Sequence, residues 1–199
     1  MLPKLIWHED EPITWPSSVS LYFVSKLAAS QVKVVLTGEG SDELFGGYER
    51  YRWNLLNEKA LKAYRLVPSG IRGAIRRTVA TTPLLKANLR RKIGHTIVGR
   101  EDSLQSLFLD NFYCAFPGQP AQAYDAYMKH FNGRAGGDLL DKMLYADSKT
   151  YLVELLMKQD QMSMAASIES RVPFLDHPLV EFAAALPLRM KLRGVTTKY

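Results

Sequence analysis

The stretch Val32-Lys33-Val34-Val35-Leu36 decides the fold class of this 199-residue chain. It is short, rich in β-branched residues and nearly all apolar, which is typical of a strand buried on both faces of a parallel sheet. A predicted helix over residues 17–29 precedes it, and a glycine-rich turn follows it. A helix, a buried strand and a glycine-rich turn in this order predict an α/β fold that is mostly helical.

The turn after this strand reads Thr37-Gly38-Glu39-Gly40-Ser41-Asp42-Glu43. In open α/β sheets, ligands bind beyond the carboxyl ends of the strands. The two glycines let the backbone bend sharply and approach a ligand closely. The three carboxylates repel one another unless a cation offsets their charge, and Mg²⁺ takes one or two carboxylates together with phosphate oxygens. The turn therefore indicates a site for phosphate and magnesium.

A plain strand-to-helix turn is the alternative interpretation of the same residues. Ser41 or Asp42 would then cap the helix, and Glu43 would lie in its first turn. The pattern alone favours neither interpretation. The G-x-x-x-x-G-K-[ST] phosphate loop is absent from the sequence, so the turn is not of that type.

The rest of the chain is predicted to be helical. Apolar spacing of three to four indicates helices over residues 49–65, 69–79 and 138–156, the last with an interruption near Thr150. The methionines that follow at positions 157, 162 and 164 are expected to fill the core. A single strand cannot form a sheet, so its partners are expected either at residues 5–7 or in sequence outside this chain.

The composition is ordinary for a globular protein, with 47% apolar and 23% charged residues. No apolar run approaches the roughly 18 residues that a membrane span needs. Residues 1–10 lack the pattern of a secretory signal, and the single cysteine, Cys114, allows no disulfide within the chain. These features predict a cytoplasmic protein.

Residues 62–100 contain ten Lys or Arg and no acid, within a net charge of +6. Such a segment attracts nucleic acid or an anionic membrane surface, or else forms a solvated helical face. Aromatic side chains that can stack on bases are nearly absent from the segment, since Tyr64 is its one Phe, Tyr or Trp. The solvated face is therefore favoured, and nucleic acid is not an expected partner.

Three segments together resemble the asparagine synthetase family. They are Val34–Tyr48, which includes the glycine-rich turn, Leu156–Met164, and Glu169-Ser170-Arg171-Val172-Pro173-Phe174-Leu175-Asp176, in the order in which the family has them. The resemblance implies a partial ATP-pyrophosphatase fold of the adenine nucleotide alpha hydrolase-like type. It also implies that ATP and Mg²⁺ are the cofactors, that aspartate is activated as β-aspartyl-AMP, and that ammonia released from glutamine by a glutaminase domain then forms the amide.

The resemblance also assigns roles within the site. Thr37, Gly38 and Gly40 would bind the nucleotide, and Asp42 would hold Mg²⁺ on the pyrophosphate. Glu39 would accept a proton from the attacking ammonium or orient it. Lys198 would neutralise the phosphate charge that develops as the P–O bond breaks.

Four charged residues of the other two segments are expected to form a buried ion-pair network under the site. They are Lys158, Asp160, Glu169 and Arg171.

Two elements of the family pattern are absent. The sequence contains no Ser-Gly-Gly-x-Asp-Ser pyrophosphate loop and no cysteine after Met1. Residues 1–199 are therefore expected to be the C-terminal portion of one synthetase domain and to be inactive in isolation. A homodimer is the candidate assembly of the protein. Glu39, where the lactam-forming relatives carry tyrosine, favours asparagine as the product. The alternatives are another acyl-adenylating, amide-forming member of the family and a non-catalytic helical binding module.

Overall fold

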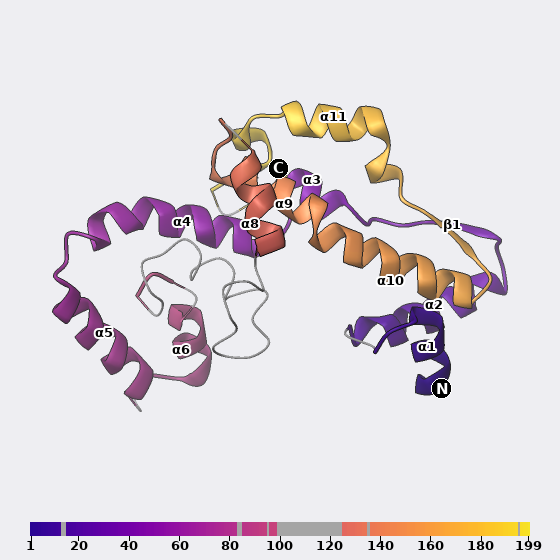
Figure 1. Ribbon diagram of the computed structural model, residues 1–199, viewed down its shortest axis with the longest axis horizontal. Helices are drawn as coiled ribbons and strands as arrows, with labels where there is room; N and C mark the ends of the chain where they lie inside the picture. The colour runs from indigo at the N-terminus through magenta and orange to yellow at the C-terminus, as the bar shows by residue number, and fades with distance from the viewer. Residues whose placement is uncertain (13–14, 83–84, 95, 99–124, 135, 195) are drawn as a thin grey trace.

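The computed structural model describes residues 1–12, 15–82, 85–94, 96–98, 125–134, 136–194 and 196–199. These residues form a mostly helical α/β structure with two small sheets (Figure 1). The helices are α1 (Leu2–Glu9), α2 (Ser17–Ala29), α3 (Ser41–Phe45), α4 (Glu49–Tyr64), α5 (Ser69–Thr81), α6 (Ala87–Gly94), α8 (Asp125–Gly133), α9 (Leu139–Lys149), α10 (Tyr151–Ala165) and α11 (His177–Ala185). The strands are β1 (Val34–Leu36), β2 (Glu169–Arg171), β3 (Leu192–Arg193) and β4 (Thr196–Thr197), with short 3₁₀ turns η2 (Pro173–Leu175) and η3 (Leu188–Met190).

The predicted helices are confirmed. Helices α2, α4 and α5 cover the residues expected from apolar spacing. The long helix predicted over residues 138–156 is two helices, α9 and α10, and the interruption is at Thr150 as expected. The Asp138 side chain accepts a hydrogen bond from the Asp141 amide and so caps the start of α9.

Strand β1 pairs in parallel with β2, with Val34 opposite Glu169 and Leu36 opposite Arg171. The partner strand is therefore within this chain. The expectation of a strand at residues 5–7 is wrong, because these residues lie in α1, where Leu5 packs into a core with Tyr22 and Met162.

The prediction that β1 is buried on both faces is wrong for this chain. The exposed fraction is 42% for Val34 and 71% for Leu36. The reason is that β1 has one partner strand among the described residues, and the helix that contacts this sheet, α10, packs chiefly on β2. The apolar sequence of the strand thus has less cover here than a strand in the middle of a sheet would have.

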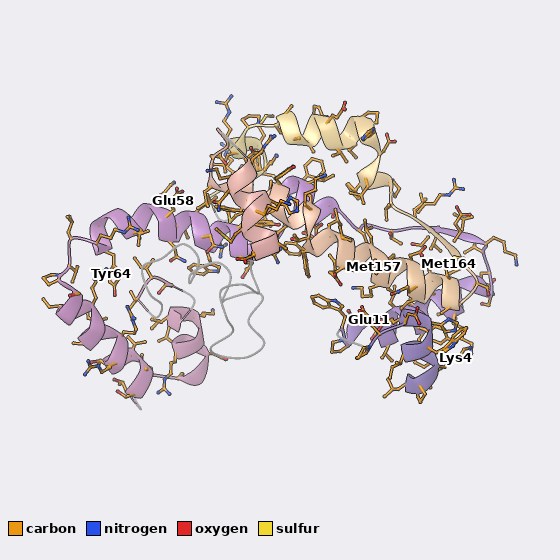
Figure 2. The ribbon with its side chains drawn as sticks, in the orientation of Figure 1. Lys4, Glu11, Glu58, Tyr64, Met157 and Met164 are labelled. Carbon is orange, nitrogen blue, oxygen red and sulfur yellow. The ribbon has the colours of Figure 1, made fainter. Side chains whose placement is uncertain are left out.

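The main core lies where α4, α8 and α9 meet, near the centre of the molecule in Figure 1. Its buried side chains include Tyr51, Phe131, Leu140 and Met143. The expectation that the three later methionines fill the core holds only for Met162. Met157 and Met164, labelled on α10 in Figure 2, are exposed, because they lie on helix faces away from the α1–α2 contact.

The basic segment extends away from the core along α4, α5 and α6 (Figure 1). Tyr64, at the end of α4 (Figure 2), has the guanidinium carbon of Arg72 at 5.6 Å from its ring centroid. The ring is half-buried and so contributes to packing between α4 and α5. Among the described residues, no helix is both long and apolar enough to cross a membrane.

Candidate functional site

The turn after β1 is anchored to β2 and then bends into α3. The Thr37 amide donates to the carbonyl of Arg171 at 2.9 Å, which continues the parallel ladder beyond the strands. Gly40 has φ +88° and caps α3, so neither Ser41 nor Asp42 is the capping residue. A Cβ at Gly40 would lie 2.9 Å from Cγ of Leu175. Glycine is therefore required here by both backbone conformation and packing.

Gly38 and Glu39 are accessible within this turn. A Cβ at Gly38 would meet nothing within 4 Å, so the backbone is open to close approach by a ligand. Glu39 is half-buried. Thr37, Gly38, Glu39 and Gly40 thus all lie in one turn at the carboxyl end of β1, as the sequence predicted.

Asp42 and Lys198 form an ion pair with a distance of 2.8 Å between Oδ1 and Nζ. Lys198 also donates to Oγ of Ser41 at 3.0 Å, although the two residues are 157 positions apart. The antiparallel β3–β4 hairpin ends immediately before Lys198, which itself has φ +53°. A lysine in the left-handed region costs on the order of 1 kcal/mol, so the surrounding structure holds this residue against its intrinsic preference.

Gly47 makes this pairing sterically feasible. A Cβ there would lie 2.7 Å from Cγ of Asp42, and closer still to its Oδ1 and to Cε of Lys198. Any other residue at this position would push the two side chains away from their present places. Gly46 therefore ends α3, and the absence of a side chain at Gly47 leaves room for the ion pair between Asp42 and Lys198.

Glu43 differs in burial from the other two carboxylates of the turn, which are half-buried. It is buried and accepts a hydrogen bond from the Tyr48 hydroxyl at 2.6 Å. Burial raises the pKa of the Glu43 carboxyl, and the bond from Tyr48 opposes this effect. The three carboxylates thus have different surroundings, since Glu43 is buried while Asp42 pairs with a lysine, and the charge of Asp42 still contributes to raising the pKa of Glu43.

A network of polar side chains on α4 and α9 packs against α3. Arg50 and Asp147 form an ion pair at 2.7 Å, and the Tyr51 hydroxyl donates to the same Asp147 oxygen. The guanidinium carbon of Arg50 lies 4.2 Å from the ring centroid of Tyr48, which in turn binds Glu43. This chain of contacts joins α9, α4 and α3.

The predicted buried network of Lys158, Asp160, Glu169 and Arg171 is not present in that form. Arg171 and Glu169 do pair at 2.8 Å, but their side chains are 64% and 55% exposed. Lys158 contacts Ser17, and Asp160 is exposed. The reason is the edge position of β2, whose side chains alternate between α10 and solvent.

The arrangement suits a metal that is held largely by phosphate oxygens. Among the described residues, no three His, Cys, Asp or Glu side chains gather as a metal cage. Asp42 offers one carboxylate, and its side chain is 35% exposed. Mg²⁺ commonly binds proteins through one or two carboxylates and completes its shell with water and substrate phosphates, so the residues present fit it.

Several site residues were not identified from the sequence as such. Ser41 belongs to the turn and Gly47 to the segment Val34–Tyr48, but their roles depend on Lys198 and on no local pattern. Tyr48 ends the same segment, which does not predict its bond to Glu43, and Asp147 carries no motif signal.

Comparisons with known proteins identify the family of the chain. The sequence model of the family described as asparagine synthase matches residues 1–199. The chain is 36% identical over 211 residues to asparagine synthetase [glutamine-hydrolyzing] 1 of Bacillus subtilis (strain 168), covering 100% of the chain and 32% of that protein. It is 34% identical over 206 residues to a putative asparagine synthetase [glutamine-hydrolyzing] of Mycobacterium tuberculosis (strain ATCC 25618 / H37Rv), covering 100% and 31%.

A more distant relative is amidase chyE of Penicillium rubens, 27% identical over 215 residues, with 94% of the chain and 31% of that protein covered. The chain thus spans about a third of the length of the curated relatives it matches. The family match along the whole chain and the identity to the bacterial relatives lead to one conclusion: the chain belongs to the asparagine synthase family.

Proposed function

We propose that this chain supplies part of the active site of an ATP-dependent, amide-forming ligase that converts aspartate to asparagine through β-aspartyl-AMP, with ammonia from glutamine. The observation that carries the proposal is the Asp42–Lys198 ion pair beside the open backbone of Gly38. It combines a carboxylate for a metal with a cation for phosphate at the carboxyl end of a parallel strand. The names of the bacterial relatives support the choice of reaction.

Lys198 has the chemistry to receive the pyrophosphate. Its ammonium is half-exposed and already held by Asp42 and Ser41, so it is oriented before a substrate binds. A pre-oriented cation stabilises the negative charge that develops on the leaving pyrophosphate without reorganising during the reaction. Asp42 would hold Mg²⁺, which supplies further neutralisation of phosphate charge when bound.

The turn itself would bind the nucleotide and the amine. The open backbone at Gly38, with Thr37 and Gly40 on either side, allows the adenylate to approach the chain closely. Glu39 is half-buried and accessible, and there it would take a proton from the nitrogen of the ammonium, so that ammonia attacks, or orient it. The identity of the carboxylic acid substrate rests on Glu39 and on the relatives' names.

We further propose that residues 1–199 are the C-terminal portion of one synthetase domain with an ATP-pyrophosphatase fold. The exposed apolar side chains of β1 suit packing against further elements of such a domain. The pyrophosphate loop and the glutaminase domain would then lie in the remainder of the protein. The chain alone is expected to be inactive, the protein cytoplasmic, and a homodimer its candidate assembly.

The test is aspartate-dependent exchange of labelled pyrophosphate into ATP by the full-length protein. Lys198→Met should reduce exchange by about 100-fold, the usual effect of removing one charge-stabilising donor. Lys26→Met, an exposed lysine on α2, serves as the matched control and should leave exchange unchanged. Glu39→Gln should slow amide formation more than exchange, because its proposed role follows adenylate formation.

Each outcome separates the candidate functions. Exchange with another carboxylic acid and none with aspartate would reject asparagine synthesis and retain acyl-adenylate chemistry. Absence of exchange with every acid tested, together with a silent Glu39→Gln variant, would favour a non-catalytic binding module.

A further inference from the structure

A cavity of about 430 Å³ lies behind α3. Its lining comes from α3, the residue after α8, α9, α10, η2, α11 and the segment before β3. Small-molecule sites in proteins have volumes of roughly 300–1,000 Å³. The cavity is therefore large enough for a small metabolite, and it contains none of the residues assigned above to the nucleotide or the metal.

One wall of this cavity is apolar. It is formed by six aliphatic side chains on five elements of the fold: Leu44, Leu144, Leu152, Leu175, Val180 and Ala184. Such a surface favours a ligand with an aliphatic body, because contact removes apolar area of both partners from water.

The remaining lining carries an excess of positive charge. Lys191, Lys149 and Arg134 contribute cations, and Glu43 and Asp141 contribute carboxylates. Arg134 and Asp141 pair with each other at 3.0 Å, and Glu43 binds the Tyr48 hydroxyl. Burial also raises the pKa of Glu43, which weakens the negative charge that it contributes.

Lys191 is the unusual member of this lining. Its exposed fraction is 4%, and no described carboxylate forms an ion pair with it. The nearby acids are already engaged, since Asp141 binds Arg134 and Asp138 accepts from the Asp141 amide to cap α9. Burial lowers the pKa of Lys191, and Asp141 and Asp138 oppose this effect only in part. The residue is thus buried as a whole, while its ammonium keeps some accessible surface and has no close partner among the described side chains. A counter-ion that reached it there would offset the unfavourable burial of its charge.

Lys191 also lines a second cavity, of about 160 Å³, which shares Asp141, Leu144 and Ala184 with the first. The lysine thus lies between two hollow regions on the same side of α9. An anion that entered the larger one would provide the partner that the protein itself does not supply.

We propose that the cavity behind α3 is a binding site for a small aliphatic carboxylic acid, whose carboxylate pairs with Lys191 and whose apolar body contacts Leu144, Leu175 and Val180. The site is separate from the proposed nucleotide site and does not depend on the proposed reaction. A neutral molecule of the same shape lacks the charge-assisted bond and binds more weakly.

Ligand-observed saturation-transfer NMR on the full-length protein tests this proposal, with isovalerate as the probe and isovaleramide as its uncharged counterpart. We expect isovalerate to bind and to give a signal. Isovaleramide should bind with an affinity that is lower by about tenfold or more, and its signal should be correspondingly weaker. Lys191→Met keeps the length of the side chain and should abolish the preference for the carboxylate. Lys26→Met, on an exposed face of α2, is the matched control and should retain it.

A second variant tests the cavity without removing a charge. Ala184→Leu adds aliphatic volume to the lining and should displace isovalerate while leaving Lys191 in place. Equal signals from the acid and the amide, an unchanged preference in Lys191→Met, or no signal from isovalerate would each overturn the proposal.

Discussion

Gly47→Ala is the substitution that most directly tests the geometry of the site. The new Cβ would lie 2.7 Å from Cγ of Asp42 and closer still to Oδ1 and to Cε of Lys198. Real Cβ atoms essentially never approach other heavy atoms below 3.0 Å, so the neighbouring atoms have to shift. The carboxylate oxygen of Asp42 has to retreat by more than about 1 Å to reach an ordinary contact distance.

The consequences for stability and for catalysis differ in size. The ion pair is partly exposed, at 35% and 42% for the two side chains, so its loss should cost less than about 1 kcal/mol of folding free energy. A misplacement of about 1 Å of groups that position a substrate can reduce turnover by about 100-fold. Gly47→Ala is therefore expected to fold but to lose most of the proposed activity.

The assay is pyrophosphate exchange by the full-length protein, measured together with the midpoint of thermal unfolding. Gly73→Ala is the control, because Gly73 lies within α5 and a Cβ there would meet nothing within 4 Å. The control should keep full exchange and gain about 0.5–1 kcal/mol of stability, as alanine is the better helix former. Exchange in Gly47→Ala within about twofold of the wild type would refute the reasoning.

Three further substitutions test the interior of the site by urea unfolding. Burial raises the folded-state pKa of Glu43 above its ordinary 4.5, so its contribution to stability is present below about pH 4.5 and is lost as the pH rises through the folded-state value. Glu43→Gln should flatten this decline above about pH 4.5, and an unchanged slope would contradict the assignment. Asp147→Ala removes the buried carboxylate that pairs with the mostly covered Arg50 and should cost about 3 kcal/mol. A loss below about 1 kcal/mol would indicate that the pair contributes little. Gly40→Ala combines φ +88° with a close approach to Leu175 and should cost at least about 1 kcal/mol, whereas a neutral result would show that the turn relaxes freely.

Local pattern predicted the helices well. The apolar spacing in α2, α4 and α5 and the interruption at Thr150 are properties of neighbouring residues, and the structure confirms them. The strand at Val34–Leu36 was also predicted, but its burial was not. A run of apolar residues indicates that a strand can be buried, while the number of strands and helices around it determines how much of it is covered.

The candidate site shows the same difference between what local sequence predicts and what tertiary contacts decide. The sequence by itself determined which residues form the turn after β1, because glycine freedom and carboxylate charge are local properties, and it left a phosphate and magnesium site as one of two interpretations of that turn. Only the tertiary structure decided that Lys198 meets Asp42, that Glu43 turns inward to Tyr48, and that Glu169–Arg171 is the partner of β1. Lys198 lies 157 positions from Ser41, and Arg171 lies 134 positions from Thr37. Contacts at such separations follow from how the helices pack, which no periodicity within a single segment specifies.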